Sequence, residues 1–352
     1  MDEALQCAKT DWPVFGLADD VRPALGAASE TGQAAVLVTL HTASGGAPRG
    51  VGAQMVVTRR TVSGYLSGGC IEADVARHAL AALADGQPRR LVYGEGGPID
   101  VRLPCGGRIE LLAERILPDD PAVACLLDLG AARKPALWIS SGATRLCCSD
   151  GESVPPEEGD LAIAFLAGRQ GTARAGQQGG AVYRLFAPRQ RFVVFGHDPT
   201  ALAMAMLARQ VGMETILVRP KGPSAPPPVP DIQYRREAPA AALAAIGADP
   251  WTAVAIAMHQ EEDDHEALVA ALSSSAGYVG LLGSSRRLPR KLARLAEAGI
   301  SPHQLARLKA PIGLKVGGHS PWEIATGVIA EVIQTANGLS ARQVPAHAVA
   351  AA

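Results

Sequence analysis

Two cysteines of this 352-residue chain stand beside paired glycines, in positions that suit a reactive thiol. Cys70 follows Gly68-Gly69 and opens a predicted helix, and Cys105 precedes Gly106-Gly107. Amide dipoles at the start of a helix stabilise a thiolate, so such a residue can act as a nucleophile or as a ligand to a soft metal. The alternative for each cysteine is a small buried side chain.

A second group of candidates lies in the C-terminal half, where each residue follows a predicted strand. These residues are Gly196, Arg219, His259, Gly283, Ser284, Arg286 and Arg287. Ligands of open α/β sheets bind at the carboxyl ends of the strands, and arginines and free backbone amides hold phosphate groups. The pattern predicts an anion or nucleotide site there. Structural turns and surface arginines are the alternative interpretation.

The first of these loops departs from the dinucleotide pattern G-x-G-x-x-G/A. Gly196 and Ala201 match its first and last positions, but Asp198 stands where bare backbone normally approaches the pyrophosphate. Arg219, together with Lys221, replaces the acid expected to bind the ribose hydroxyls. This substitution favours an additional phosphate. The loop therefore predicts either altered nucleotide binding or a purely structural turn.

The C-terminal half also contains a candidate metal site. His259 ends an apolar strand, and Asp263 and His265 follow it closely. Imidazole and carboxylate groups at such spacing can ligate zinc. The alternative is that the run Glu261–Glu266 forms the solvated first turn of a helix.

Local patterns indicate which elements carry these residues. In the N-terminal part, an apolar strand over 34–40 leads into the glycine loop 44–52, a second strand covers 53–58, and strands flank Leu103–Gly107. A helix is predicted from Cys70 to about Ala84, with Ile71, Val75, Ala79 and Leu83 on its buried face. From Arg191 onward, strands and helices alternate as in a doubly wound parallel sheet.

These patterns predict an order of domains along the chain. An N-terminal domain covers 1–118, a joining region with short strands at 136–140 and 161–165 covers 119–189, and the alternating domain covers 190–338. Its last helix starts with the capping sequence Ser320-Pro321 and is expected to end at Asn337-Gly338. A flexible tail is expected over 339–352.

Composition excludes several classes of protein. With 48% hydrophobic residues, 33 basic residues and 34 acidic ones, the chain has ample core and no net field that would attract nucleic acid or a membrane. Its six cysteines form no disulfide framework, and neither a signal peptide nor a membrane-spanning run is recognisable. We expect a cytoplasmic protein with reduced thiols, whose partner is a small molecule or a protein.

The sequence resembles the XdhC/CoxI family, maturation factors for molybdenum hydroxylases such as xanthine dehydrogenase and aldehyde oxidoreductases. The resemblance covers about 34–114 and 191–337. It rests on the segments SGGAPRGVGAQMVV, LSGGCIEADV, LPCGGRIELL, YVGLLGSSRR, APIGLKVGGHSPWEIA and AEVI.

The resemblance implies a mixed α/β N-terminal domain followed by a Rossmann-like doubly wound C-terminal domain. It implies a chaperone rather than an enzyme, one that binds the molybdenum cofactor, assists its sulfuration and inserts it into an apo molybdenum hydroxylase. A homodimer is expected, with a cysteine desulfurase and a cofactor nucleotidyltransferase as further partners.

Within this resemblance, the candidate residues acquire roles. Cys70 or Cys105 would contact the molybdenum, while Arg49 and the amides of the glycine loops would hold the pterin phosphate. The C-terminal site would take the nucleotide part of a cytosine dinucleotide form of the cofactor, with Arg219, Arg286 and Arg287 as phosphate partners.

Some positions depart from the family pattern, and other functions remain open. The family commonly has G-x-G-H where this chain has Gly196-His197-Asp198-Pro199, and a histidine where it has Lys309. These departures argue against ordinary use of NAD. The rival hypothesis is an NAD(P)-dependent oxidoreductase that uses the C-terminal domain, and a third is a protein-interaction scaffold with a vestigial nucleotide fold.

Overall fold

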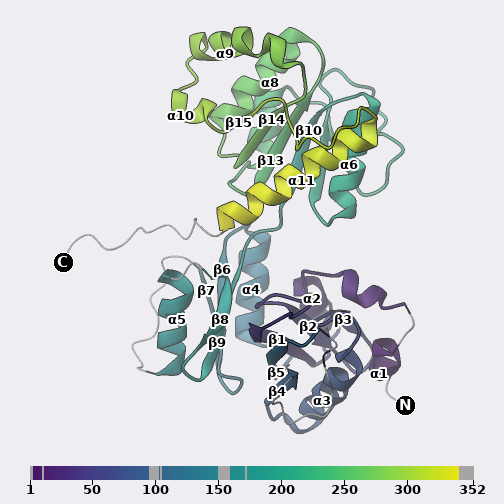
Figure 1. Ribbon diagram of the computed structural model, residues 1–352, viewed down its shortest axis with the longest axis vertical. Coiled ribbons are helices and arrows are strands. Elements are labelled where there is room, and N and C mark those ends of the chain that lie inside the picture. Colours follow the sequence, from purple (N-terminus) through teal and green to yellow (C-terminus); the bar gives the residue numbers. More distant parts are fainter. Residues whose placement is uncertain are drawn as a thin grey trace, which may run out of the picture. The chain divides into compact units, whose positions relative to one another are not determined.

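A computed structural model describes residues 3–9, 12–94, 103, 105–149, 159–170 and 173–340. The chain forms two compact units, the first extending to Ala187 and the second beginning at Pro188 (Figure 1). The segment that we expected to join two domains contributes its strands and helices to the first unit. Among the described residues, no helix is long and apolar enough to cross a membrane.

A five-stranded antiparallel sheet forms the first half of unit 1, with the strand order β3-β2-β1-β5-β4. Its strands are β1 (Ala35–Ser44), β2 (Gln54–Val57), β3 (Val62–Gly64), β4 (Arg89–Gly94) and β5 (Arg108–Ile116). The central strand β1 is buried from Ala35 to His41, because helices or a second sheet cover both faces. The predicted strands around the glycine loops are therefore confirmed.

The helices of this half are α1 (Glu3–Ala8), α2 (Arg22–Glu30) and α3 (Glu72–Asp85), and a short 3-10 helix, η1, spans Val14–Leu17. Helix α3 buries Val75, Ala79 and Leu83 against the sheet, as their spacing predicts. Gly86, with φ +75°, ends the helix in the left-handed conformation that glycine adopts without strain. Its start lies two residues after Cys70, at Glu72.

A second antiparallel sheet completes unit 1, with the strand order β7-β6-β9-β8. Its elements are α4 (Pro121–Ala131), β6 (Ala136–Ser140), β7 (Arg145–Ser149), α5 (Asp160–Gln170), β8 (Ala175–Gln178) and β9 (Ala181–Phe186). The prediction of a strand at 161–165 is wrong, because these residues lie in α5. A five-residue apolar run is equally compatible with a helix that buries Ala164 and Phe165 and exposes Ile163.

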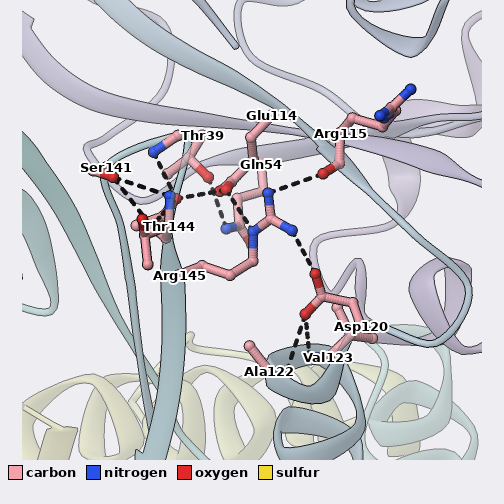
Figure 2. A network of polar contacts seen from close by, with 12 residues as sticks. Thr39, Gln54, Glu114, Arg115, Asp120, Ala122, Val123, Ser141, Thr144 and Arg145 are labelled. Atoms are coloured by element: carbon pink, nitrogen blue, oxygen red, sulfur yellow. Dashed lines mark hydrogen bonds and ion pairs between the residues drawn. The ribbon is translucent and has the colours of Figure 1, made fainter. Parts of the chain in front are cut away.

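A buried polar network connects the two sheets of unit 1 (Figure 2). Glu114 of β5 accepts a hydrogen bond from Ser140 of β6 at 2.5 Å and pairs with Nε of Arg145 of β7 at 3.0 Å. The guanidinium of Arg145 also donates to the carbonyl of Arg115 at 2.9 Å and pairs with Asp120, whose carboxylate caps α4. One arginine thus joins both sheets and a helix.

Unit 2 is a doubly wound parallel sheet with the strand order β12-β11-β10-β13-β14-β15 (Figure 1). Its strands are β10 (Arg191–Gly196), β11 (Glu214–Val218), β12 (Gln233–Arg235), β13 (Thr252–Ala257), β14 (Tyr278–Leu281) and β15 (Leu308–Lys309). In chain order this is 3-2-1-4-5-6, the arrangement of Rossmann domains. The predicted fold of this half is confirmed.

Helices cover both faces of this sheet. They are α6 (Pro199–Gln210), α7 (Pro239–Ile246), α8 (Glu261–Ser273), η2 (Ser285–Arg287), α9 (Leu288–Glu297), α10 (Pro302–Leu305) and α11 (Pro321–Ser340). Phe192 and Val194 of β10 point to the core under α6 and α11, and Val193 and Phe195 point to the core under α7 and α8. Burial on both faces explains why these strands read as continuous apolar runs.

The last helix begins where the capping sequence predicts and ends later than predicted. Ser320 and Glu323 exchange hydrogen bonds at the start of α11, with the amide of Ser320 2.9 Å from the Glu323 carboxylate. The helix continues through Asn337-Gly338 to Ser340, because these weak helix formers still propagate a last turn. Of the expected tail, residues 341–352 lie outside the described part of the chain.

Candidate functional site

Three loops of unit 1 lie at the same end of its first sheet. The register pairs Ser44 with Arg108 and Thr39 with Gln54, and it places Gly64 opposite Met55. The loop after β1, the loop after β3 and the loop before β5 consequently leave the sheet on one side. These loops carry Arg49, Cys70 and Cys105, so the fold gathers the N-terminal candidates at one end.

Glu72 organises the loop that carries Cys70. Its side chain is fully buried, and both carboxylate oxygens accept hydrogen bonds from the loop that precedes it. The donors are the amides of Leu66 (3.0 Å), Ser67 (2.7 Å), Gly68 (3.3 Å), Gly69 (2.9 Å) and Ile71 (3.2 Å) and the hydroxyl of Ser67 (2.8 Å). The loop is a concave ring of amides closed around an internal anion.

This ring sets the charge state of Glu72 and the shape of the loop. Burial alone raises the pKa of a carboxyl group, but the hydrogen bonds from Ser67 and Leu66 outweigh it and hold the pKa of Glu72 below its ordinary value. Gly68 and Gly69 adopt φ values of +108° and +109°, which other residues rarely tolerate. Their amides face Glu72, so in this conformation they are not available to a phosphate group.

The loop presents Cys70 to solvent. Its amide donates to the hydroxyl of Ser67 at 3.1 Å, and its side chain is exposed. Since α3 begins only at Glu72, the thiol lies ahead of the helix and not in its first turn. The alternative of a small buried residue therefore does not hold for Cys70.

A pocket of about 250 Å³ adjoins this loop. It is lined by Pro13, Phe15, Gly16, Leu17, Tyr65, Gly68, Gly69 and Glu72. Its walls are mainly apolar and aromatic, and the two glycines leave open space where a side chain would project. Such a surface can pack against a planar ring.

Arg49 lies beside the same pocket. Its guanidinium carbon stands 4.7 Å from the centre of the Tyr65 ring, and the guanidinium pairs with Asp19. Asp19 is exposed while Arg49 is largely covered. The charge of Arg49 is therefore partly compensated within the protein, and its guanidinium lies against Tyr65, which lines the pocket.

Cys105 is exposed on a loop that packs closely on the loop after β1. A Cβ atom on Gly46 would lie 2.7 Å from the carbonyl oxygen of Cys105, and one on Gly107 would lie 2.9 Å from the amide of Ala47. Gly107 is thus required for the contact between the loops, and Gly106 adopts φ +68°. Of the predicted segment Leu103–Gly107, residue 104 is outside the described residues.

The C-terminal candidates lie at one edge of the parallel sheet of unit 2. Strands β10, β11, β13 and β14 run parallel, so their carboxyl ends share that edge. Gly196 ends β10, Arg219 follows β11, His259 follows β13, and Gly283, Ser284, Arg286 and Arg287 follow β14. Of these residues, His259, Gly283, Ser284 and Arg287 line one pocket at this edge, whereas Gly196, Arg219 and Arg286 do not line it.

Asp198 occupies the first loop of this edge and caps α6. Its Oδ1 accepts from the amide of Ala201 at 2.8 Å, and its Oδ2 lies 2.9 Å from Nε2 of His259. A Cβ atom on Gly196 would lie 2.7 Å from that of Ala201, so the close helix packing expected of these two residues is present. The start of α6, however, already binds a carboxylate where a dinucleotide would place its pyrophosphate.

The acidic run after β13 is structural. Glu261 and Glu262 pair with Arg294 of α9, and the buried Asp264 pairs with Lys291 at 2.7 Å. The run forms the first turn of α8, as the alternative interpretation predicts, with Glu262 exposed and only Asp264 buried. Among the described residues, no group of three or more histidine, cysteine or acidic side chains could hold a metal ion, so the set His259, Asp263 and His265 does not form a site.

Sequence reasoning missed three residues of the N-terminal site. Glu72 lies within the predicted helix, and neither it nor Phe15 or Tyr65 is among the candidate residues predicted from the sequence. The available signal was the distance of two residues between Cys70 and Glu72, which lets the carboxylate reach back to the loop. The pocket walls had no comparable signal, because η1 and the loop after β3 meet through tertiary packing alone.

Two segments of the chain match models of known protein families. Residues 28–94 match a model described as the XdhC and CoxI family, and residues 192–332 match the XdhC Rossmann domain. A relative from Escherichia coli, the molybdenum cofactor insertion chaperone PaoD, is 33% identical over 90% of this chain and 89% of its own length. This chain belongs to the XdhC and CoxI family.

Two further proteins are similar to this member of the family. A Bacillus subtilis protein, named as a probable xanthine dehydrogenase subunit, is 29% identical over 88% of this chain and 96% of its own length. A solved structure from Bacillus halodurans, described as a xanthine dehydrogenase, superposes with a TM-score of 0.71 at 24% identity, over 91% of this chain and 96% of that one. At that identity the match concerns the fold alone.

Proposed function

We propose that this member of the XdhC and CoxI family binds the molybdenum cofactor and delivers it to an apo molybdenum hydroxylase. The observation that carries the proposal is the exposed thiol of Cys70, next in the chain to Gly69, which lines the 250 Å³ pocket with Phe15 and Tyr65. The name of the Escherichia coli relative supports the same cargo.

The residues of the site fit this cargo by their chemistry. Thiolate sulfur is a suitable ligand for a soft metal centre, so Cys70 or Cys105 would contact the molybdenum. The rings of Phe15 and Tyr65 would pack on the pterin, with Arg49 beside them near its phosphate. This differs from our expectation for the glycine loop, because Glu72 holds its amides and leaves the phosphate to side chains.

A carrier must also release what it binds. A site open to solvent, with a thiol on a surface loop, exposes the cargo to a second protein. We propose that the recipient is a hydroxylase of the xanthine dehydrogenase or aldehyde oxidoreductase type and that sulfuration, by a cysteine desulfurase, precedes transfer. A cofactor nucleotidyltransferase and a second copy of the chain are further proposed partners, and we place the process in the cytoplasm.

We propose that the nucleotide end of a cytosine dinucleotide form binds at the carboxyl edge of unit 2. Arg219, Arg286 and Arg287 lie there and carry positive charge. An oxidoreductase that uses NAD(P) is less compatible with this edge, since the carboxylate of Asp198 caps α6 where a pyrophosphate would bind.

The test is a pterin assay on protein purified from cells that make the cofactor. Acid and iodine oxidation converts bound cofactor to fluorescent pterin, which is quantified per chain together with released CMP. Near-stoichiometric pterin is expected, and CMP beside it assigns the dinucleotide form. If pterin is absent and added cofactor also fails to bind, the proposed function is wrong.

A further inference from the structure

We infer that unit 2 binds the phosphate group of a nucleotide in the pocket after β14, between Ser284, Arg287 and Lys291, and not at the loop after β10. The nucleotide itself is assigned through the proposed function. The phosphate site rests on the geometry of unit 2.

The loop after β10 is unsuited to an anion. Asp198 uses one carboxylate oxygen to accept from the amide of Ala201 and the other to pair with Nε2 of His259. A phosphate there would have to displace this carboxylate from the start of α6 or lie against its negative charge. Both arrangements cost free energy, because like charges at close range repel.

The pocket after β14 has a volume of about 140 Å³. It is lined by His259, Asp264, Leu281, Leu282, Gly283, Ser284, Ser285, Arg287, Leu288, Lys291, Ala310 and Pro311. It opens at the carboxyl ends of β13, β14 and β15, which are neighbours in the sheet. Its small volume fits a phosphate group with part of a sugar better than a whole nucleotide, so the base would lie outside it.

The pocket offers hydrogen-bond donors that the protein does not use. Within the described residues, the backbone amides of Gly283, Ser284 and Ser285 donate to no protein acceptor. The hydroxyl of Ser284 accepts from the amide of Arg286 at 3.3 Å, which leaves its own proton free to donate. Gly283 has no side chain, and the space that a Cβ atom would occupy there is open.

The distribution of charge favours an anion. Three of the five basic residues of η2 and α9 pair with acids of α8: Arg290 with Glu261, Arg294 with Glu261 and Glu262, and Lys291 with Asp264. In the described part of the chain, Arg286 and Arg287 pair with no carboxylate, and Arg287 lines the pocket.

The acid that lines the pocket does not oppose this assignment. Both carboxylate oxygens of Asp264 are engaged, one by the amide of Met258 at 3.2 Å and one by Lys291 at 2.7 Å. The charges of Asp264 and Lys291 compensate each other. The net positive charge at the pocket is therefore that of Arg287, with Arg286 beside it in the chain.

The experiment is calorimetric titration of the full chain with CMP, with cytidine and inorganic phosphate as separate probes. Two variants form a matched pair: Arg287→Ala and Arg290→Ala each remove one guanidinium from the same stretch of chain. Arg287→Ala should weaken CMP binding at least tenfold, and Arg290→Ala less than twofold. A third variant, Asp198→Ala, should leave CMP affinity within twofold.

Several results would overturn the inference. They are equal binding of cytidine and CMP, equal loss in both arginine variants, CMP affinity that rises strongly in Asp198→Ala, or no CMP binding at all. The pterin assay separates this inference from the proposed function. If the chain binds pterin but not CMP, the phosphate site is rejected and the proposed carrier function stands. If it binds CMP in a way that depends on Arg287 but binds no pterin, the phosphate site stands and the proposed carrier function is rejected.

Discussion

The Oδ2 atom of Asp198 lies 2.9 Å from Nε2 of His259, so the loops after β10 and β13 are bridged where the order of strands reverses. Ligands of doubly wound sheets usually enter at that place. The bridge holds a carboxylate at the start of α6, where a dinucleotide would bring its pyrophosphate.

The cap provided by Asp198 can be separated from its pairing with His259. Asp198→Ala removes both interactions and should lower the free energy of unfolding by about 1 kcal/mol. Asp198→Ser removes the pairing with His259 but keeps an oxygen that can cap α6. It should lower the free energy of unfolding by only a few tenths of the amount lost in Asp198→Ala. Urea denaturation measures both. Equal losses would show that the cap is not the stabilising interaction.

Glu72→Gln should destabilise unit 1 and disorder the loop of Cys70. The carboxylate of Glu72 accepts six hydrogen bonds as an anion. A glutamine amide is neutral, and its NH₂ group would face donors instead of accepting from them. We therefore expect the free energy of unfolding to fall by at least about 2 kcal/mol. The matched control is Glu110→Gln, which changes a half-buried carboxylate that pairs with Arg108 at 3.0 Å. The control should cost clearly less, and equal costs would contradict the role given to Glu72.

Glu72 also predicts a dependence of stability on pH. Because the pKa of Glu72 is lowered in the folded chain, its stabilising contribution is complete above the ordinary value of 4.5 and is lost as the pH falls through the lower folded value. Unfolding measured between pH 7 and pH 3 should therefore show a shallower acid loss in Glu72→Gln than in the unsubstituted chain. Parallel curves would assign the acid loss to other groups.

Cys70→Ala should lower the pterin content of the purified chain several-fold without changing its urea midpoint, because the thiol is exposed and supports no core. Cys105→Ala, measured beside it, shows whether the second exposed thiol contributes. Cys125→Ala is the control: that thiol is half-buried on α4 and donates to the carbonyl of Cys147 at 3.3 Å. Unchanged pterin content in both Cys70→Ala and Cys105→Ala would reject metal contact by a thiolate.

Arg145→Met should destabilise unit 1 by about 3–5 kcal/mol, since it leaves the buried carboxylate of Glu114 without its partner. The double variant Glu114→Gln with Arg145→Met removes the unpaired charge of Glu114, though not that of Asp120, and should recover part of that loss. Calorimetric or urea unfolding of four proteins, namely the unsubstituted chain, Arg145→Met, Glu114→Gln and the double variant, measures the coupling. If the double variant is as unstable as the sum of the single ones, the pair is not coupled.

Much of the fold follows from local patterns in the sequence. The strands of unit 2 are buried on both faces and appear in the sequence as apolar runs. In α3, the spacing of four residues places Val75, Ala79 and Leu83 on one face of the helix. Capping residues at Ser320 and Glu323 placed the start of the last helix. Where the pattern was short, as at 161–165, it did not distinguish a strand from a helix, because five residues complete too few periods.

The sequence by itself determined the candidate loops, the two thiols and the doubly wound second unit, because these depend on residue types at fixed spacing. Tertiary structure alone decided which groups of these loops are engaged within the protein. Glu72 turns back into the amides of its own loop, Asp198 reaches a residue 61 positions away, and Phe15 meets Tyr65 in a pocket. Such hydrogen bonds and contacts join residues that no local period relates, and they decide which donors remain free for a ligand.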